Sequence, residues 1–337
     1  MSSNTAILLA ALVSLTISGA LGVWLIPFLH KLKYGQTILD IGPKWHKNKQ
    51  GTPTMGGFMF IAGVLAATAV CTLTLALVDR APENDYGMVL GARLFAGLLM
   101  ALGFSLIGFA DDYVKVAKKR NLGLTARQKL VVQFVVAGLY LWALYAAGDR
   151  STILIVPFLG QFDFGVFYWP LSVLGVVYFV NSVNLTDGLD GLAGSVTMMA
   201  ALGFLAVSSL LGIVPMQIFS AALAGGCLGF LIWNFYPAKV FMGDTGSMFL
   251  GGCVVALAFG CGMPALLALV GIIYIVESLS VILQVISFKT TGKRIFKMSP
   301  IHHHFEMSGY SEVQIVAAFT LVTAVGCVLA VVSIFFL

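Results

Sequence analysis

The stretch VQIVAAFTLVTAVGCVLAVVSIFF, residues 313–336, carries no charged side chain. A helix needs about 20 consecutive, mostly apolar residues to cross the hydrocarbon core of a bilayer, so this stretch predicts a transmembrane helix. Similar apolar runs recur along the chain and divide it into ten predicted spans. The predicted spans are 5–29, 53–78, 88–110, 128–147, 168–186, 192–211, 216–235, 246–262, 264–287 and 313–336.

The composition of the 337 residues agrees with these spans. Apolar residues make up 59% of the chain and charged residues only 10%, against about 25% charged residues in an average soluble domain. These proportions exclude a soluble globular enzyme, a disordered tail and a secreted disulfide scaffold. An outer-membrane barrel would show short alternating strands instead of long apolar runs. We therefore predict an all-α, polytopic membrane protein with ten transmembrane helices in a single domain, residues 1–337. Its five cysteines are predicted to be buried apolar residues.

The basic residues predict the orientation of the chain. Of the 19 Lys and Arg residues, all but Arg80, Arg93 and Arg150 fall in loops on one side of the predicted spans. Cytoplasmic loops carry the excess of Lys and Arg, so that side is predicted to be cytoplasmic and both termini periplasmic. The first apolar run lacks a basic segment before it and exceeds the length of a signal peptide, so we expect a retained helix. Residues 151–167, on the periplasmic side, alternate in polarity around a turn near residue 160, which predicts a small β-hairpin.

The predicted cytoplasmic side holds two adjacent carboxylates, Asp111 and Asp112, where the third span ends. Adjacent carboxylates repel each other, so one of them is expected to hold a proton or to share a cation. If the helix continues, Lys115 lies four residues after Asp111 and three after Asp112, on the same face. A solvated, charge-balanced helix end is the alternative explanation of the pair.

A more specific pattern follows the fifth apolar run, where Asn181, Asn184, Asp187 and Asp190 recur every three residues. In a helical conformation this spacing makes one polar stripe. A charged group at the centre of the bilayer costs at least about 2.5–3.5 kcal/mol, so these carboxylates are expected at the interface or in a polar cleft. The intervening glycines allow a tight turn or the close approach of a ligand. A segment that only caps the helix and turns the chain is the alternative.

Three further segments on this side carry polar residues. Asp244 precedes an apolar run, and it is expected either to cap a helix N-terminus or to bind a cation beside a bound phosphate. Thr54, in a glycine-rich segment, is expected either to approach an anion or to belong to a simple turn. Consecutive side chains diverge on a helix, so a single zinc site made by His302, His303 and His304 would be strained. Contacts from these imidazoles to phosphate or sugar oxygens are favoured instead.

Carboxylates that suit Mg²⁺, lysines that suit a diphosphate, and glycines thus gather at one membrane interface. Mg²⁺ is commonly bound by one or two carboxylates together with substrate phosphates. The combination points to phosphoryl transfer between a water-soluble nucleotide and an acceptor embedded in the membrane.

Five motifs, in order along the whole chain, resemble those of the phospho-N-acetylmuramoyl-pentapeptide-transferase family (translocase I, MraY), which belongs to the polyprenyl-phosphate N-acetylhexosamine-1-phosphate transferases. They are GTPTMGG at 51–57, DDY at 111–113, NLTDGLDGL at 184–192, FMGDTGS at 241–247 and PIHHHFE at 300–306. The histidine motif is the most discriminating of the five. The resemblance implies transfer of phospho-N-acetylmuramoyl-pentapeptide from UDP-N-acetylmuramoyl-pentapeptide (UDP-MurNAc-pentapeptide) to undecaprenyl phosphate, with lipid I and UMP as products. It further implies Mg²⁺ as cofactor and a homodimer in the lipid bilayer of the bacterial inner membrane, with no nucleic-acid partner.

The resemblance also implies roles for individual residues. Asp244 resembles the principal magnesium ligand, with Asp187 and Asp112 close to the metal and the diphosphate. Asp111 resembles the residue that deprotonates the lipid phosphate, and His303, with His302, resembles the histidine motif of the active site. The remaining residues expected to bind substrate are Lys49, Thr54, Lys115, Asn184, Asp190, Asn234, Gln284 and His304, with Phe241 as the aromatic residue under the uracil.

Two other functions compete with this interpretation. A sister enzyme of the same superfamily, which uses UDP-N-acetylglucosamine, would share the aspartates and differ in the histidine loop. An ion-coupled transporter would place its ionisable groups near the middle of the membrane. Only Glu277 is expected deep within a span, and its role is left open by the sequence.

Overall fold

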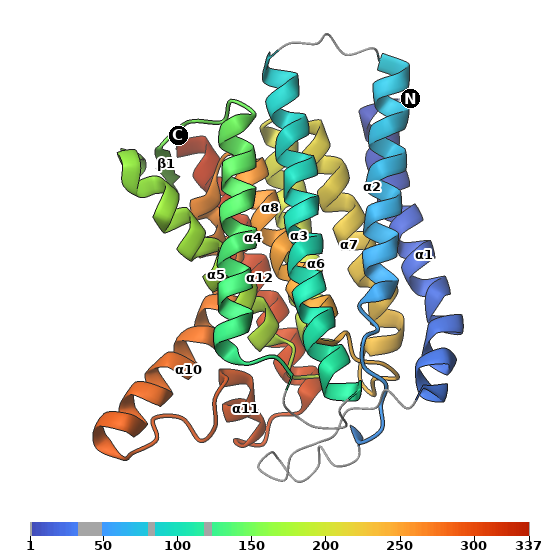
Figure 1. The fold of residues 1–337 in the computed structure, drawn as a ribbon, viewed down its shortest axis with the longest axis vertical. Helices are drawn as coiled ribbons and strands as arrows, with labels where there is room; N and C mark the ends of the chain where they lie inside the picture. Colours follow the sequence, from blue (N-terminus) through green and yellow to red (C-terminus); the bar gives the residue numbers. More distant parts are fainter. Residues whose placement is uncertain (1, 33–48, 80–84, 118–122, 337) are drawn as a thin grey trace.

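The computed structural model describes residues 2–32, 49–79, 85–117 and 123–336, and over these ranges the chain is a bundle of long helices (Figure 1). The long helices are α1 (Ser3–Lys31), α2 (Phe58–Asp79), α3 (Asp85–Ala117), α4 (Ala126–Ala146), α5 (Tyr168–Thr186), α6 (Leu192–Leu210), α7 (Val214–Asn234), α8 (Gly243–Gly260), α10 (Ile272–Thr291) and α12 (Glu312–Ser333). The shorter elements are strands β1 (Ile153–Val156) and β2 (Gly160–Asp163), helices α9 (Leu267–Val270) and α11 (Ile301–Glu306), and the 3₁₀ helices η2 (Gly165–Phe167), η3 (Pro264–Leu266) and η4 (Ile334–Phe336).

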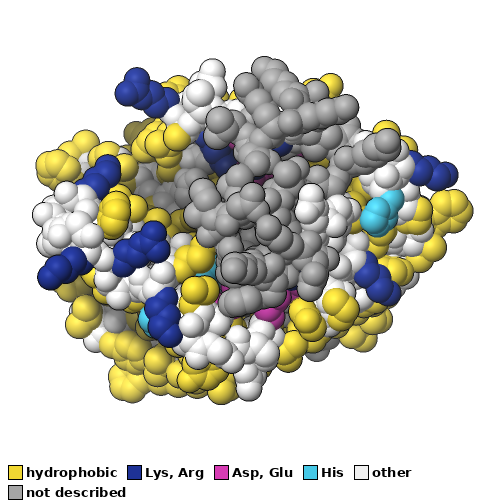
Figure 2. All heavy atoms as spheres, turned by 90° about the horizontal axis from the view of Figure 1, so that it is seen from below, with side chains coloured by type: hydrophobic (Ala, Val, Ile, Leu, Met, Phe, Trp, Pro, Cys, Tyr) yellow, Lys and Arg dark blue, Asp and Glu magenta, His cyan; other side chains and the backbone are white. Residues whose placement is uncertain are grey.

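Within the described part of the chain, nine helices are long and apolar enough to cross a membrane, and α2 is apolar over Phe58–Thr74. These helices correspond to the ten predicted spans, so the prediction of an all-α, multi-pass membrane protein is confirmed. Helix α1 begins and α12 ends at the same end of the bundle, while the last turn of α3 lies at the opposite end (Figure 1). Figure 2, which looks onto that opposite end, shows Lys and Arg side chains spread around the face.

Two predicted spans have different boundaries in the structure. The second span was predicted from residue 53, but α2 begins at Phe58 because residues 53–57 run along the segment before α8. The ninth was predicted as one helix over 264–287, but the chain there forms η3, α9 and then α10. Gly271 separates α9 from α10 with a ψ of 18°, which differs from the helical value and breaks the helix. Figure 1 shows α10 running outward from the bundle beyond this break.

Helix α8 is the centre of the bundle, and its residues from Thr245 to Gly260 are all buried. Small residues allow the backbones around it to approach closely, as is typical of membrane helix interfaces. A Cβ atom added to Gly252 would lie 2.6 Å from the Cα of Ala101 in α3. A Cβ atom added to Gly108 of α3 would lie 2.1 Å from the carbonyl oxygen of Asp244. This close packing holds the end of α3 against the start of α8.

The predicted hairpin between the fourth and fifth spans is confirmed. Strands β1 and β2 pair in antiparallel fashion, with Ile153 opposite Asp163 and Val156 opposite Gly160. The hairpin lies at the end of the bundle where the chain ends, and Figure 1 places β1 near the C-terminus.

Candidate active site

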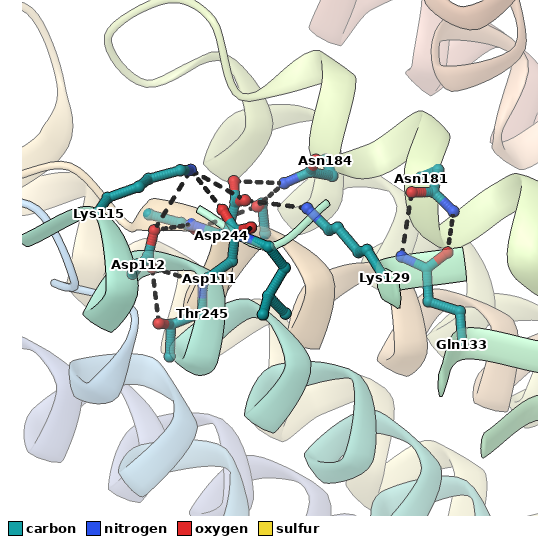
Figure 3. A network of polar contacts seen from close by, with 12 residues as sticks. Asp111, Asp112, Lys115, Lys129, Gln133, Asn181, Asn184, Asp244 and Thr245 are labelled. Carbon is teal, nitrogen blue, oxygen red and sulfur yellow. Dashed lines mark hydrogen bonds and ion pairs between the residues drawn. The ribbon is translucent and has the colours of Figure 1, made fainter. Parts of the chain in front are cut away.

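Three carboxylates meet where the last turns of α3 face the first turn of α8. One oxygen each of Asp111, Asp112 and Asp244 lies within 4.8 Å of the others. Asp111 and Asp112 are buried, and Asp244 is half-buried. The three side chains come from two helices and point toward one another (Figure 3). The predicted pair of adjacent carboxylates is therefore part of a larger site, and the alternative of a solvated helix end is wrong.

Asp112 caps the N-terminus of α8 from the neighbouring helix. Its carboxylate accepts hydrogen bonds from the backbone N–H of Asp244 (3.2 Å), the backbone N–H of Thr245 (2.9 Å) and the hydroxyl of Thr245 (2.7 Å). A carboxylate at this position also interacts favourably with the helix dipole. The N-cap residue of α8 is Met242, whose side chain makes no capping hydrogen bond. The alternative in which Asp244 caps the helix is therefore wrong, and the Asp244 carboxylate faces the cluster instead.

Two lysines contact the carboxylates. Lys115 lies one turn after Asp111 on α3, and its Nζ is 2.6 Å from Asp111 Oδ2 and 3.3 Å from Asp244 Oδ2. The predicted placement of Lys115 on the face of the aspartates is confirmed. The second lysine, Lys129, comes from the first turn of α4 and lies 2.9 Å from Asp244 Oδ2 (Figure 3).

Lys129 was counted only as one of the basic residues that set the orientation. A lysine in the first turn of a helix is unfavourable beside the positive end of the helix dipole. Its helix start is nevertheless well defined, because Thr125 and Gln128 form a capping box. This unfavourable position is the signal that the sequence offered, and it is a weak one because the cost is only about 0.3–1 kcal/mol.

The four residues of the predicted polar stripe after the fifth apolar run contact different partners. Helix α5 ends at Thr186, so only Asn181 and Asn184 lie on it. Asn184 donates hydrogen bonds to Asp244 Oδ1 (3.0 Å) and Ser247 Oγ (2.7 Å). Asn181 pairs with Gln133 of α4 instead, away from the carboxylates (Figure 3). The stripe therefore contributes to the site chiefly through its later members.

Asp187 follows the last residue of α5 and is half-buried. Burial, together with the nearby carboxylates of Asp244, Asp112 and Asp190, raises the pKa of Asp187 to about 8. Among the described residues, Asp187 is not one of the three carboxylates that lie within 4.8 Å of each other. Its raised pKa shows a crowded acidic environment, which an additional positive charge would relieve.

A second cluster surrounds Lys49. The Lys49 ammonium lies 2.7 Å from Asp190 Oδ1 and 2.6 Å from Glu312 Oε2. Burial lowers the pKa of Lys49, but the hydrogen bonds to the two carboxylates outweigh this effect and the net pKa is raised. Glu312 also accepts a hydrogen bond from the backbone N–H of Asp190. It is the first residue of α12, within the capping box formed by Ser311 and Gln314, and we did not predict it as a site residue.

Three more of the expected substrate-binding residues lie around these clusters. Asn234 accepts a hydrogen bond from the backbone N–H of Gly191 (3.1 Å) and donates one to the carbonyl of Val240 (2.9 Å). The backbone N–H of Phe241 binds the carbonyl of Pro53, and this contact places the segment containing Thr54 beside the start of α8. A Cβ atom added to Gly243 would lie 2.8 Å from Thr54 Oγ1, which puts the hydroxyl near the carboxylates.

The three histidines of α11 have different partners, as their helical spacing predicts. His302 Nδ1 lies 3.0 Å from Glu277 Oε1, and both residues are fully buried. His303 Nδ1 lies 2.7 Å from Glu306 Oε2. His304 Nδ1 accepts a hydrogen bond from the backbone N–H of Lys297. Glu277, whose role the sequence left open, therefore holds the first histidine of the run.

The ring of His302 contacts the turn that carries Asp187 and Asp190. A Cβ atom added to Gly188 would lie 2.2 Å from His302 Nε2, so only glycine leaves room for the ring.

Gln284 lies on α10, and its amide binds the backbone of residues Ile295 and Phe296. These contacts order the segment that leads to α11, and none of them joins Gln284 to the carboxylates.

The cluster has the donor chemistry of a magnesium site. Three carboxylates from two helices supply hard oxygen donors, and they outnumber the two lysines that contact them. The lysine ammonium groups are compact positive charges that suit phosphate oxygens. The site can therefore bind a divalent cation together with a phosphorylated substrate.

Residues 94–262 match the family described as Glycosyl transferase family 4, and this range contains the three clustered carboxylates. Over nearly its whole length the chain is similar to curated proteins named phospho-N-acetylmuramoyl-pentapeptide-transferase. The relative from Clostridium perfringens (strain 13 / Type A) is 46% identical over 328 residues, 97% of this chain and 98% of the relative. The relative from Caldanaerobacter subterraneus subsp. tengcongensis is 48% identical over 320 residues, 95% of this chain and 96% of the relative. The relative from Halalkalibacterium halodurans is 44% identical over 325 residues, 96% of each chain.

Proposed function

Because the chain belongs to the phospho-N-acetylmuramoyl-pentapeptide-transferase family, we propose that it transfers phospho-N-acetylmuramoyl-pentapeptide from UDP-MurNAc-pentapeptide to undecaprenyl phosphate. The observation that carries this proposal is the group of three carboxylates and two lysines at one end of an apolar helix bundle. At that position a soluble nucleotide can arrive from water while a polyprenyl phosphate remains in the bilayer. The products are lipid I and UMP.

The carboxylates of Asp244 and Asp112 would hold Mg²⁺, with Asp187 close to the metal and Asp111 within 4.8 Å of both ligands. When bound, Mg²⁺ neutralises charge on the diphosphate of the donor. The hydrogen bonds from Thr245 and from the N-terminus of α8 fix the orientation of Asp112. Asn184 fixes that of Asp244.

In the transfer step, an oxygen of undecaprenyl phosphate attacks the phosphorus that is bonded to the sugar. The bond between this phosphorus and the bridging oxygen breaks, and UMP leaves with that oxygen. Lys115 and Lys129, which contact Asp244, are positioned to stabilise negative charge on the transferred group and on UMP. Asp111 receives the proton of the lipid phosphate where that phosphate arrives protonated. Direct attack is favoured because the lipid phosphate already carries an anionic oxygen nucleophile.

The cluster around Lys49 is proposed as the nucleotide subsite. Lys49 and Asp190 are paired there, and Asn234 orders the adjoining turn. Phe241, in the segment between this turn and α8, is proposed to stack on the uracil. Gln284 and the histidines of α11 are proposed to contact the sugar and its peptide arm.

We further propose Mg²⁺ dependence, a bacterial inner-membrane location with the aspartates on the cytoplasmic face, and a homodimer. The orientation is supported by the distribution of Lys and Arg, since Arg93 and Arg150 lie at the end opposite the aspartates. The family resemblance supports the dimer and the cofactor.

The test is UMP release by the purified protein with undecaprenyl phosphate and each of two donors, UDP-MurNAc-pentapeptide and UDP-N-acetylglucosamine. The two donors share uridine diphosphate, so Lys49, Asp190 and Phe241 cannot discriminate between them. The polar residues near α11 are expected to do so, because groups that bind the peptide arm would be left unpaired by the smaller donor. Turnover of UDP-MurNAc-pentapeptide alone, and its loss on addition of EDTA, is expected. Comparable kcat/KM for both donors, or preference for UDP-N-acetylglucosamine, would assign the chain to the sister activity.

A further inference from the structure

The β1–β2 hairpin has two different faces, because residues opposite each other in an antiparallel pair share a face. Ile153, Ile155 and Gln161 line a cavity of about 210 Å³. The other walls of this cavity belong mainly to residues of α3, α4, α5 and α8. Ile155 packs against the core of the bundle, while Ile153 (44%) and Gln161 remain exposed at the rim of the cavity. The opposite face carries Leu154, which pairs with Phe162. Neither of these two residues lines the cavity, so this second face points away from it.

The face that points away is apolar, and all of it except the half-buried Leu154 is exposed. Phe162 is 48% exposed, and the turn contributes Phe158 (47%) and Leu159 (72%). The ring of Phe158 lies 5.8 Å from that of Phe336 in η4, which is itself 68% exposed. We name Leu154, Phe158, Leu159, Phe162 and Phe336 the hairpin patch. A hairpin with one face on protein and the other in water alternates apolar and polar residues, whereas both faces of this hairpin carry apolar residues.

The hairpin starts beside a cluster of aromatic residues at the ends of α4 and α5. It joins the end of α4 to the start of α5, and Tyr145 of α4 contacts Trp169 of α5 with 5.3 Å between ring centroids. The guanidinium of Arg150 lies 5.0 Å above the ring of Tyr145. Tyr and Trp gather at the boundary between lipid and water. The hairpin therefore extends along this boundary and not from the middle of the bilayer.

The end of the hairpin that joins the helices carries a polar cluster among exposed apolar residues, of which Val166 (75%) and Phe167 (69%) are the most exposed. Where its strands join the helices, the hydroxyl of Thr152 donates a hydrogen bond to Asp163 (2.6 Å), and the N–H of Gly165 donates another (2.9 Å). These bonds lower the pKa of the Asp163 carboxyl, which favours the ionised form and contact with water. The turn, by contrast, carries Phe158 and Leu159. The turn has no charged residue, so it is the part of the hairpin that can enter lipid, while the Asp163 carboxylate requires water.

We propose that the hairpin is a membrane anchor, whose patch is embedded among the lipids of the leaflet farthest from the aspartates. The occupant of the patch is the bilayer itself, because the patch is uncharged and continues the apolar surface of the spans at an aromatic boundary. The ladder between β1 and β2 pairs only the backbone groups that face each other. The outer edges of both strands still need hydrogen-bond partners that hydrocarbon cannot give, so the patch reaches no deeper than the interfacial layer, where water and lipid headgroups are available. The anchored hairpin is thereby held over the cavity that its inner face lines.

The test places an NBD fluorophore on single cysteines in vesicles of phosphatidylethanolamine and phosphatidylglycerol. Leu159→Cys reports on the patch, Ser151→Cys on the polar end of the same hairpin, and Leu321→Cys on the exposed surface of α12. The five native cysteines are buried, so labelling of the folded protein is directed to the new thiol. Phospholipids brominated near the head of the acyl chain quench a probe in lipid, and iodide quenches a probe in water. Retained UMP release in each labelled variant checks the fold.

At position 159 we expect quenching by the brominated lipid that approaches the value at 321, and iodide quenching several-fold weaker than at 151. Strong iodide quenching at 159, equal to that at 151, would place the turn in water and overturn the proposal. Protection from iodide without quenching by brominated lipid would show that protein covers the patch, either a second copy of the chain or another partner, and would overturn it as well.

Discussion

Replacement of Gly108 by alanine is expected to separate α3 from the start of α8. The added Cβ would lie 2.1 Å from the carbonyl oxygen of Asp244, whereas real Cβ contacts are not shorter than 3.0 Å. Both partners belong to helix backbones and cannot rotate away, so the helices must move apart by roughly 1 Å in a tightly packed interior.

This shift acts directly on the candidate site. The hydrogen bonds of Asp112 to the start of α8, at 2.7–3.2 Å, would lengthen beyond the hydrogen-bonding range. Each such bond to a charged group contributes about 1.5–3 kcal/mol. A displacement of about 1 Å among catalytic groups can reduce the rate by about 100-fold. We therefore expect Gly108→Ala to lower kcat by about two orders of magnitude.

The assay is UMP release, with thermal unfolding of the detergent-solubilised protein measured in parallel. Gly91→Ala is the matched control, since it lies on the same helix and its Cβ would meet nothing within 4 Å. It is expected to retain activity and to be more stable by up to about 1 kcal/mol, because alanine is the better helix former. If Gly108→Ala does not fold, Thr245→Val removes one of the bonds to Asp112 at similar volume, and we expect a loss of activity in the folded protein. Wild-type kcat in folded Gly108→Ala, or in Thr245→Val, would refute the proposed dependence of the site on this contact.

Three further changes test other parts of the structure. Asp244→Asn keeps the size of the side chain and removes the charge, so UMP release is expected to be nearly abolished with the unfolding temperature retained; activity within a few-fold of wild type would remove Asp244 from the proposed cation site. Glu277→Gln keeps a hydrogen-bond acceptor for His302, so it is expected to retain more activity than Glu277→Ala. Equal losses of activity in the two variants would show that the hydrogen bond to His302 is not what the site requires. Impermeant thiol reagents applied to intact cells are expected to label Gln161→Cys and not Lys297→Cys, and the reverse pattern would invert the proposed orientation.

Much of the fold follows from local properties of the sequence. Each long helix is marked by an apolar run, and the run of residues 313–336 alone is longer than the roughly 20 residues needed to cross a bilayer. Glycine, proline and capping residues mark the ends of several helices, for example the capping box at Thr125. The break at Gly271 was missed, because hydropathy remains high across it and gives no sign of a change in direction.

The residue types of the site could also be predicted from the sequence, because carboxylates and lysines are rare beside apolar runs and stand out there. The placement of Lys115 on the face of Asp111 depends only on the repeat of the helix, and it was predicted correctly. The divergence of the histidines depends on the same repeat.

The partners of these residues were decided by the tertiary structure. Asp112 caps a helix that begins more than one hundred residues later, and Lys129 reaches Asp244 from α4. Glu312, on the last long helix, completes the pair of Lys49 and Asp190. Helical spacing relates residues within one or two turns, so it determines faces and ends by itself. Which helix ends meet depends on the packing of small residues such as Gly108 against a distant backbone, and that contact exists only in the folded chain.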